Sequence, residues 1–568
     1  MKVSSYILDF LVSQGVDTVF LVTGGVITPV VDAFHGRTDI KYVCVQQEQA
    51  AAMAADGYAR FKGLGVCMAT SGPGATNLIT GIGCSYFDSI PVLCITGQVN
   101  TNDAKGDSGV RQRGFQETDI VSIVKPITKY AAVVNSVDDI ATQLEYAVYM
   151  AQEGRQGPVL LDIPIDVQMS EMPPERTNKV IISFADKPYM SHKVIETINL
   201  ISESKRPVVI YGQGARGAKV ELIQFIESTG IPCVPSWAAL DLIPHDHPLF
   251  VSQFGVYGSR AGNYTVQNAD LIIAIGTRLD GRMTGAKGFA PKAKLVVVDL
   301  DAAEIEKNKV DVAILADAKD FLDAIGTDFT PNLKERKTWI DRINEWKDRY
   351  AIKSEVNNGL IQPLEFISHL ISLLPKDAII VADSGANLSY TQQAAYLTGE
   401  QRLFSAYGYS PMGYSVQAAI GAWYATGRPV IAICGDGSLQ MNMQELQTLK
   451  HYNIPIKVFV LNNRSYGIIK QFQEELFEGR YLATDEEGGY STPNFARIAE
   501  AYGLKNIQML NAQVTEWMTC AVLDSDLPYI ADVHIDKDSR IEPKTRYGNP
   551  IERQHPLLPD AEHAENMA

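Results

Sequence analysis

The amino-acid sequence predicts an α/β fold with three doubly wound domains, each built on a parallel sheet. Strand-forming runs alternate with helical segments along most of the 568-residue chain. Glycine-rich turns follow several of these runs, which is typical of parallel α/β sheets. The chain also exceeds a single hydrophobic core, because a prior of roughly 150 residues per domain predicts about three or four domains.

The first domain is predicted over residues 1–172 and the second over 188–335. The strand-like runs of the first are DTVFLVTGG, IKYVCVQQE, LGVCMATSGPG, IPVLCITGQ and, at its end, GPVLLDIPIDVQ. Those of the second are RPVVIYGQGARG, ADLIIAIGTRLDGR and KLVVVDLDAAEI. Between the two domains, MSEMPPERTNKVIISFADKP is rich in proline and charge, so we expect a linker there.

The third domain is predicted over residues 355–540, after the polar helical stretch NLKERKTWIDRINEWKDRY. It runs from DAIIVADSGAN through PVIAICGDGS and IPIKVFVLNNRSYG to LPYIADVHID. The remaining tail, residues 541–568, is polar and contains prolines. We expect this tail to be a mobile arm.

Composition narrows the classes of partner. The formal charge of -16 and the pI of about 5.1 argue against a nucleic-acid-binding surface, so small molecules are the expected partners. The sequence shows no secretion signal and no run near the roughly 20 apolar residues of a membrane span. The seven cysteines form no CxxC pair. Reduced, mostly buried thiols and a cytoplasmic location are therefore predicted.

Two polar clusters follow strand-like runs in the third domain. Gly435-Asp436-Gly437-Ser438 comes after VIAIC, and Asn462-Asn463 comes after IKVFVL. In a parallel sheet the carboxyl ends of neighbouring strands share one edge, where ligands bind. Asp436 and Asn463 would supply two oxygen ligands for Mg²⁺, and the glycines would let backbone approach a diphosphate. A β-turn followed by an unrelated Asn loop is the alternative.

Gly-Asp-Gly followed by Asn-Asn at this spacing resembles the motif of thiamine diphosphate (ThDP) enzymes. The resemblance implies pyrimidine-binding, central FAD-binding-like and diphosphate-binding domains, in that order. It also implies that Asp436, Asn463 and the backbone carbonyl of Ser465 hold Mg²⁺. The ThDP contacts that it implies in this domain are Met412, Gly435, Gly437, Ser438, Tyr466, Gly467 and Ile468. Met412 matches the residue that supports the bent cofactor, although an ordinary core methionine is the alternative.

The first domain carries the second feature of this family. Glu48 begins EQAAAMAADGYAR, and TSGPGATN follows at 70–77. In the family a glutamate at this position protonates the aminopyrimidine and so activates the cofactor. The resemblance adds Gly24, Gly25, Pro73 and Asn77 as ThDP contacts. A glutamate placed only for the helix dipole is the alternative for Glu48.

Because the glutamate and the metal motif lie in different domains, the cofactor must span two of them. In family members these two domains come from different subunits. The resemblance therefore implies a homodimer or homotetramer with the active site at the subunit interface.

Within the family, the chain to about residue 540 resembles the acetohydroxyacid synthase branch. GTRLDGRMTG, VVVDLDAAEIEKN and VDVAILADA are similar to the segments that hold FAD in that branch. The implied FAD contacts, with the flavin in a structural role, are Gly212, Gly214, Arg216, Gly276, Arg278, Asp299 and Asp317. A degenerate middle domain without flavin is the alternative.

The substrate pocket is also implied by resemblance. Phe115 and Gln116 match residues that line the reaction pocket, and Arg282 matches the arginine that binds the acceptor carboxylate. A surface arginine is the alternative for Arg282. Four positions depart from the synthase pattern on the flavin or acceptor side: Ile165, Tyr257, Gly281 and Phe472.

The basic run GDSGVRQRGFQETDI is more similar to ThDP carboligases of bacterial surface-polysaccharide synthesis, such as the yersiniose type. Arg111 and Arg113 could meet a nucleotide diphosphate, or they could be solvated loop arginines. The sequence thus predicts a carboligase dependent on ThDP, Mg²⁺ and FAD. It would decarboxylate pyruvate and transfer the hydroxyethyl unit to a carbonyl acceptor, which we expect to be a keto-deoxysugar nucleotide.

Four alternatives stay open. They are an acetolactate synthase catalytic subunit with pyruvate as acceptor, a flavoenzyme of the pyruvate oxidase kind, a cyclic diketone hydrolase and a non-enzymatic binding protein. The presence of Glu48, Asp436 and Asn463 together argues against the last.

Overall fold

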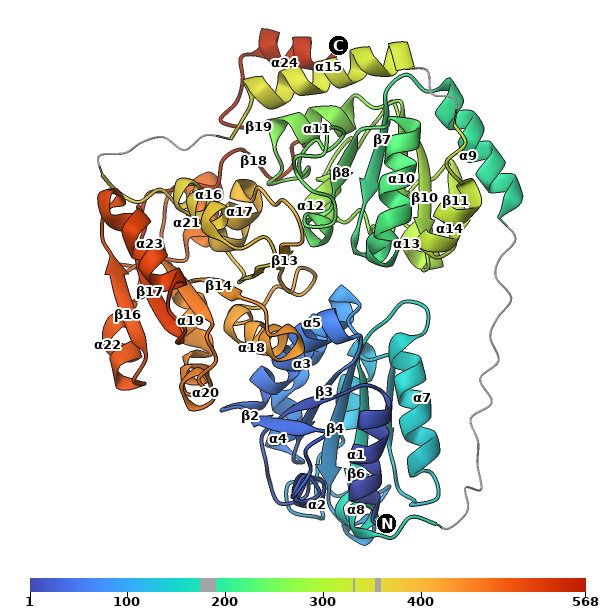
Figure 1. The fold of residues 1–568 in the computed structure, drawn as a ribbon, viewed down its shortest axis with the longest axis vertical. Coiled ribbons are helices and arrows are strands. Elements are labelled where there is room, and N and C mark those ends of the chain that lie inside the picture. The colour runs from blue at the N-terminus through green and yellow to red at the C-terminus, as the bar shows by residue number, and fades with distance from the viewer. Residues whose placement is uncertain (174–189, 330–332, 353–358) are drawn as a thin grey trace.

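The computed structural model describes residues 1–173, 190–329, 333–352 and 359–568, and it contains three parallel sheets, each flanked by helices (Figure 1). The predicted fold class is confirmed. Residues 174–188 of the predicted linker, and the predicted domain limits at 188 and 355, lie outside the described residues.

The N-terminal sheet has the strand order β2-β1-β3-β4-β6-β5, with every pair parallel. Burial of successive residues in β3, β4 and β6 agrees with a sheet covered on both faces. The strands are β1 (Thr18–Leu21), β2 (Lys41–Cys44), β3 (Gly65–Ala69), β4 (Val92–Gln98), β5 (Tyr130–Val133) and β6 (Val159–Pro164). The helices are α1 (Val3–Ser13), α2 (Thr28–Asp32), α3 (Glu48–Lys62), α4 (Pro73–Asn77), α5 (Ile79–Asp88), α6 (Ile120–Val124), α7 (Ile140–Gln152) and α8 (Ile165–Met169).

The central sheet has the order β11-β10-β9-β7-β8 and is also parallel. Its strands are β7 (Pro207–Tyr211), β8 (Cys233–Pro235), β9 (Leu271–Ile275), β10 (Lys294–Asp299) and β11 (Val312–Leu315). Its helices are α9 (Ser191–Glu203), α10 (Lys219–Thr229), α11 (Arg260–Gln267), α12 (Gly281–Thr284), α13 (Ala302–Glu306), α14 (Ala318–Ile325) and α15 (Leu333–Arg349).

The C-terminal sheet has the order β13-β12-β14-β15-β17-β16 and repeats the parallel design. Its strands are β12 (Ile379–Ala382), β13 (Arg402–Phe404), β14 (Val430–Gly435), β15 (Lys457–Asn462), β16 (Lys505–Met509) and β17 (Tyr529–His534). Its helices are α16 (Pro363–Leu373), α17 (Ala386–Ala394), α18 (Ser415–Thr426), α19 (Asp436–Met441), α20 (Leu446–His451), α21 (Gly467–Leu476), α22 (Phe495–Ala501) and α23 (Thr515–Leu523).

Helix α3 of the first domain packs directly on α18 of the third (Figure 1). A Cβ atom added at Gly57 would lie 2.1 Å from the carbonyl oxygen of Ala418, so the two backbones are almost in contact. The same buried seam contains Asp56, which accepts hydrogen bonds from Arg60 and from the hydroxyl of Tyr414. One apolar cluster runs through both domains at this seam.

The acid Glu445 ties the same two domains together. Its fully buried carboxylate accepts the backbone N–H of Gln46 at 3.0 and 3.2 Å and the hydroxyl of Thr448 at 2.6 Å. Burial raises the pKa of Glu445 from its ordinary value of 4.5 to about 7. A glutamine side chain could keep both hydrogen bonds without carrying charge.

We therefore expect Glu445→Gln to change the pH dependence of stability. The raised pKa means that the acid stabilises the fold fully below pH 4.5 and loses this contribution as pH rises through about 7. The loss is at most about 3 kcal/mol and is absent in the variant. Thermal unfolding is measured at pH 5 and at pH 8. The melting temperature of the variant relative to that of wild type should be higher at pH 8 than at pH 5. An equal gap at both pH values would contradict the prediction.

The C-terminal tail is ordered, so the expectation of a mobile arm is wrong. It forms β18 (Lys544–Thr545), β19 (Gln554–His555) and α24 (Asp560–Met567), which lie beside the central domain (Figure 1). Asn263 donates to the carbonyl of Ile551 at 2.7 Å, and Trp346 donates to the side chain of Asn566 at 2.9 Å. A few buried anchors fix the segment in spite of its polar composition.

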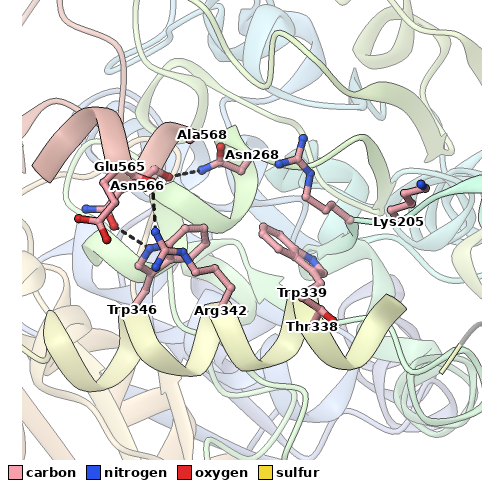
Figure 2. A pocket seen from close by; sticks show the side chains of 10 residues that line it. Lys205, Asn268, Thr338, Trp339, Arg342, Trp346, Glu565, Asn566 and Ala568 are labelled. Carbon is pink, nitrogen blue, oxygen red and sulfur yellow. Dashed lines mark hydrogen bonds between the residues drawn. The ribbon is translucent and has the colours of Figure 1, made fainter. Parts of the chain in front are cut away.

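Helix α15 extends the central domain beyond residue 335, because Trp339, Ile343 and Trp346 are buried in its core. Figure 2 shows α15 and α24 side by side, with Arg342 donating to the carbonyl of Glu565. They border a cavity of about 500 Å³, which is also lined by Lys205 and Asn268.

Two other expectations concern the cysteines and the possibility of a membrane-spanning helix. All seven cysteines carry free thiols, and five of them are buried. Along the described parts of the chain, each helix is either too short or too polar to cross a bilayer.

Candidate active site

Two loops meet at the carboxyl edge of the C-terminal sheet. Strands β14 and β15 are neighbours, with Gly435 paired in register with Leu461, so the clusters that follow them are adjacent. Asp436 is the first residue of α19, and Asn463 directly follows β15. The structure thus places the two predicted oxygen ligands on one edge.

The Asp436 carboxylate is buried, and its two oxygens differ. Oδ1 accepts the backbone N–H of Gly437 at 2.7 Å and the hydroxyl of Tyr490 at 3.1 Å. Oδ2 is buried and has no hydrogen-bond partner among the described residues. Burial raises the pKa of Asp436 to about 6. A buried, unpartnered carboxylate oxygen fits a divalent cation, which would supply the missing partner.

The residues after β15 complete this loop. Asn463 accepts the backbone N–H of Ser465 at 3.2 Å through its side-chain oxygen. The hydroxyl of Ser465 is also buried, and it has no hydrogen-bond partner among the described residues. The sequence pointed only to the Ser465 carbonyl, so this hydroxyl was not predicted as part of the site. Tyr466 lies against Gly437, where an added Cβ would come within 2.4 Å of the tyrosine ring. Gly467 and Ile468 then begin α21.

A third loop on this edge, Ser384 to Asn387, follows β12 and was not among the predicted site residues. Gly385 has a φ of +99°, a conformation that favours glycine, and α17 begins after it. A Cβ at Gly435 would lie 3.3 Å from the Asn387 side-chain oxygen, so this loop faces the Gly-Asp-Gly turn. The sequence feature that could have indicated this loop is DSGAN, a glycine-containing turn after a buried strand, as in CGDGS.

Met412 lies half-buried in the loop between β13 and α18. The buried carboxylate of Asp383 accepts the backbone N–H of Gly413 at 2.9 Å, and Asn442 donates to the Gly413 carbonyl at 2.9 Å. These bonds hold the Met412 backbone beside the diphosphate loops. Ser438 contributes a buried hydroxyl to the same edge.

Glu48 is the first residue of α3, which extends from the N-terminal sheet. Its Oε2 accepts a hydrogen bond from the side chain of Asn77 at 2.9 Å. A Cβ at Gly74 would lie 3.4 Å from Oε1, so α4, which begins at Pro73, borders the acid. Glu48 is half-buried within one chain.

The neighbouring loops carry the other residues predicted on this side. A Cβ at Gly24 would overlap the Thr70 side chain at 2.5 Å, whereas Gly25 is open. Gln116 adopts a φ of +61°, and its carbonyl would be 2.7 Å from a Cβ at Gly72. Phe115 beside it is 84% exposed. The structure therefore brings Gln116 to the loop that precedes α4 and leaves the Phe115 side chain in solvent.

Within the described residues of one chain, no hydrogen bond or ion pair joins Glu48 or Asn77 to the diphosphate loops. The two halves of the predicted cofactor site are therefore each assembled on their own sheet.

The predicted FAD residues lie at the carboxyl ends of four neighbouring central strands. Gly212, Gly276 and Asp299 follow or end β7, β9 and β10, and Asp317 comes after β11. The Gly212 and Gly214 N–H groups donate to the carbonyls of Ile275 and Gly276 at 3.0 Å. Contact between these two loops is thus a structural reason for the glycines.

Other predicted FAD residues have partners within the chain. Arg216 forms an ion pair with buried Asp241 at 2.5 Å, and Arg278 pairs with Glu304 at 3.1 Å. Asp317 caps α14 by accepting the backbone N–H of Lys319 at 2.8 Å. Asp299 accepts the N–H of Asp301, and burial raises the pKa of Asp299.

The predicted acceptor residues Arg282 and Phe472 each have partners within the chain. Arg282 donates to the Tyr407 carbonyl at 3.2 Å and lies 6.0 Å from the ring of Trp237, which packs on Tyr257. The ammonium of Lys544 lies over the ring of Phe472, with its nitrogen 4.3 Å from the ring centroid.

Lys544 is 2% exposed and pairs with half-buried Glu475 at 3.0 Å. Because this lysine belongs to the tail, the sequence analysis did not place it near the pocket. Arg111 and Arg113 are exposed on a loop braced by Glu117, which accepts the N–H of Arg113 at 2.9 Å.

Three parallel-sheet domains, with Glu48 at the edge of the first sheet and Asp436 and Asn463 at the edge of the third, agree with a ThDP-dependent enzyme. The chain matches three family descriptions, each under the heading of thiamine pyrophosphate enzyme: the N-terminal TPP binding domain over 1–123, the central domain over 194–325 and the C-terminal TPP binding domain over 383–533.

Among its relatives, the acetolactate synthase large subunit of Parasynechococcus marenigrum is 36% identical over 552 residues, covering 94% of this chain and 88% of the relative. A probable acetolactate synthase large subunit of Methanocaldococcus jannaschii is 36% identical, with 94% and 92% covered. Chloroplastic acetolactate synthase 1 of Zea mays is 34% identical, with 95% and 86% covered. The chain belongs to the acetohydroxyacid synthase superfamily of thiamine pyrophosphate enzymes.

Proposed function

We propose that this enzyme decarboxylates pyruvate and transfers the two-carbon unit to a second pyruvate, forming acetolactate. The names of its relatives, matched over more than nine-tenths of the chain, favour this acceptor over the keto-sugar nucleotide that the sequence analysis placed first. The proposal rests on the buried Oδ2 of Asp436, which has no hydrogen-bond partner among the described residues. This oxygen lies where the loops after β12, β14 and β15 meet at one edge of the sheet.

In this proposal each residue has a definite task. Asp436, Asn463 and the Ser465 carbonyl would hold Mg²⁺, which would neutralise the charge of a diphosphate. ThDP supplies the carbanion chemistry when bound. At Glu48, Oε2 is occupied by Asn77, which leaves Oε1 to hold and release a proton beside α4. Gln116 lies against the loop that precedes α4 and would line the reaction pocket there.

The keto-deoxysugar nucleotide remains a second candidate acceptor. Arg111 and Arg113 are both exposed, and neither guanidinium has an ion pair among the described contacts, so both are free to meet a diphosphate. The departures from the synthase pattern at Ile165, Tyr257, Gly281 and Phe472 also support a different acceptor.

FAD is proposed as a structural cofactor of the central domain. The support is the row of Gly212, Gly276 and Asp299 along one carboxyl edge, where dinucleotides bind in parallel sheets. The visible absorbance of the purified protein tests this, and peroxide formation with pyruvate would indicate a pyruvate oxidase type instead.

We also propose that two chains complete each ThDP site, as a homodimer or as a homotetramer. The support is that Glu48 and Asp436 belong to clusters that no described hydrogen bond joins within one chain. Sedimentation with and without ThDP tests this arrangement.

The central test supplies carbon-labelled pyruvate to the purified protein with ThDP, Mg²⁺ and FAD, alone and with a keto-deoxysugar nucleotide. Labelled acetolactate from pyruvate alone, detected by NMR, is the expected result. A branched sugar formed in preference to acetolactate would move the proposal to the second acceptor. Untouched pyruvate in both samples would overturn pyruvate as donor and direct the search to cyclic diketones.

A further inference from the structure

Tyr490 belongs to the loop that follows α21, and its hydroxyl reaches the carboxylate of Asp436. Its ring centroid is 4.2 Å from that of Tyr466, and the residue is 8% exposed. The Tyr466 N–H donates to the Thr484 carbonyl at 2.9 Å, and the Tyr490 N–H donates to the Asp485 carbonyl at 2.8 Å. The loop is thus folded on itself and attached to the chain just beyond Asn463.

The direction of the Tyr490 hydroxyl proton is fixed by its neighbours. Gln440, one turn after Asp436 on α19, donates its side-chain amide to the Tyr490 oxygen at 3.3 Å. Because the amide can only donate there, the hydroxyl proton is left for Asp436 Oδ1, which lies 3.1 Å away.

This hydrogen bond determines which oxygen of Asp436 remains open. Gly437 and Tyr490 both donate to Oδ1, whereas Oδ2 has no partner among the described residues. A carboxylate with one oxygen held by two donors cannot rotate freely, so Oδ2 stays directed away from them. Groups that orient a metal ligand in this way typically change metal affinity 10–100-fold.

We propose that Tyr490 is a positioning residue that pre-orients Asp436 for divalent cation binding, with Gln440 setting the direction of its hydroxyl. This inference rests on the proposed metal site. It adds a residue from a loop outside the Gly-Asp-Gly and Asn-Asn motifs.

The test compares Tyr490→Phe with wild type by titrating Mn²⁺ in the presence of ThDP and following free Mn²⁺ by electron paramagnetic resonance. The variant keeps the ring against Tyr466 and loses only the hydroxyl. We expect metal affinity to fall about 10–100-fold. Turnover at saturating metal should stay near the wild-type level, so the loss appears in metal dependence and not in kcat.

Tyr481→Phe is the matched control, because Tyr481 also donates its hydroxyl to a carboxylate, that of Glu474, at 2.7 Å in the same loop region. It should leave metal affinity unchanged. Equal affinities in wild type and Tyr490→Phe, or equal losses in both variants, would overturn the inference. If Tyr490→Phe does not fold, Gln440→Ala should show a smaller loss in the same direction, and no loss there would overturn it.

Failure of the metal site itself gives a different result. Wild type would then bind no Mn²⁺ with ThDP, and Asp436→Asn would behave as wild type does. Binding by wild type with no change in Tyr490→Phe would reject the positioning role alone.

Discussion

Glu48→Gln is expected to lower kcat for pyruvate by about 10²–10⁴-fold, the usual range for loss of a general acid or base. Glutamine has nearly the same shape, and its oxygen can still accept the Asn77 hydrogen bond seen at 2.9 Å. It cannot hold a transferable proton at Oε1. The expected pattern is therefore a chemical defect with cofactor binding retained, measured by labelled-pyruvate turnover and by ThDP titration.

Glu153→Gln is the control, because Glu153 is an exposed glutamate of the same domain at the end of α7. It should have wild-type turnover. Activity of Glu48→Gln within about threefold of wild type would remove Glu48 from the mechanism. Loss of ThDP binding in that variant would instead assign Glu48 to binding.

Gly421→Ala is expected to have the largest effect on stability. Its Cβ would lie 1.8 Å from the Ala54 carbonyl oxygen, which is backbone and cannot rotate away. Helices α3 and α18 would have to separate along their buried seam, at a cost of about 3 kcal/mol or more. We expect a large fall in melting temperature and in the yield of folded protein.

Activity should fall with it, because α3 begins at Glu48 and separation of the helices would displace that acid. Gly217→Ala is the matched control, since no atom lies within 4 Å of its Cβ position and its φ is not positive. A melting temperature of Gly421→Ala close to that of the control would show that the seam tolerates more space than the structure gives it.

Much of the fold and of the diphosphate side of the candidate site could be predicted because both depend on short-range patterns. Strand runs and the turns after them predicted three parallel sheets, and the spacing of Asp436 and Asn463 predicted one shared edge. The tail could not be predicted in this way. Its order depends on Asn263, Trp346 and Ile551, which are distant in sequence and meet only after the central domain folds.

The same reason explains the residues that sequence reasoning missed. Tyr490 and Lys544 belong to no motif, and each gains its place from a contact across the fold, with Asp436 and with Phe472. Arg216 and Asp317 also have partners that the motifs do not predict, because Arg216 pairs with buried Asp241 and Asp317 caps α14.

The sequence by itself determined the fold class and the family motifs, because alternating strands and helices and the residues at strand ends are local properties. Only the tertiary structure decided that the tail is fixed, that α3 and α18 meet backbone to backbone, and that Oδ2 of Asp436 is the open oxygen. These features depend on burial and on which atoms lack partners, and both are set by the packing of distant segments.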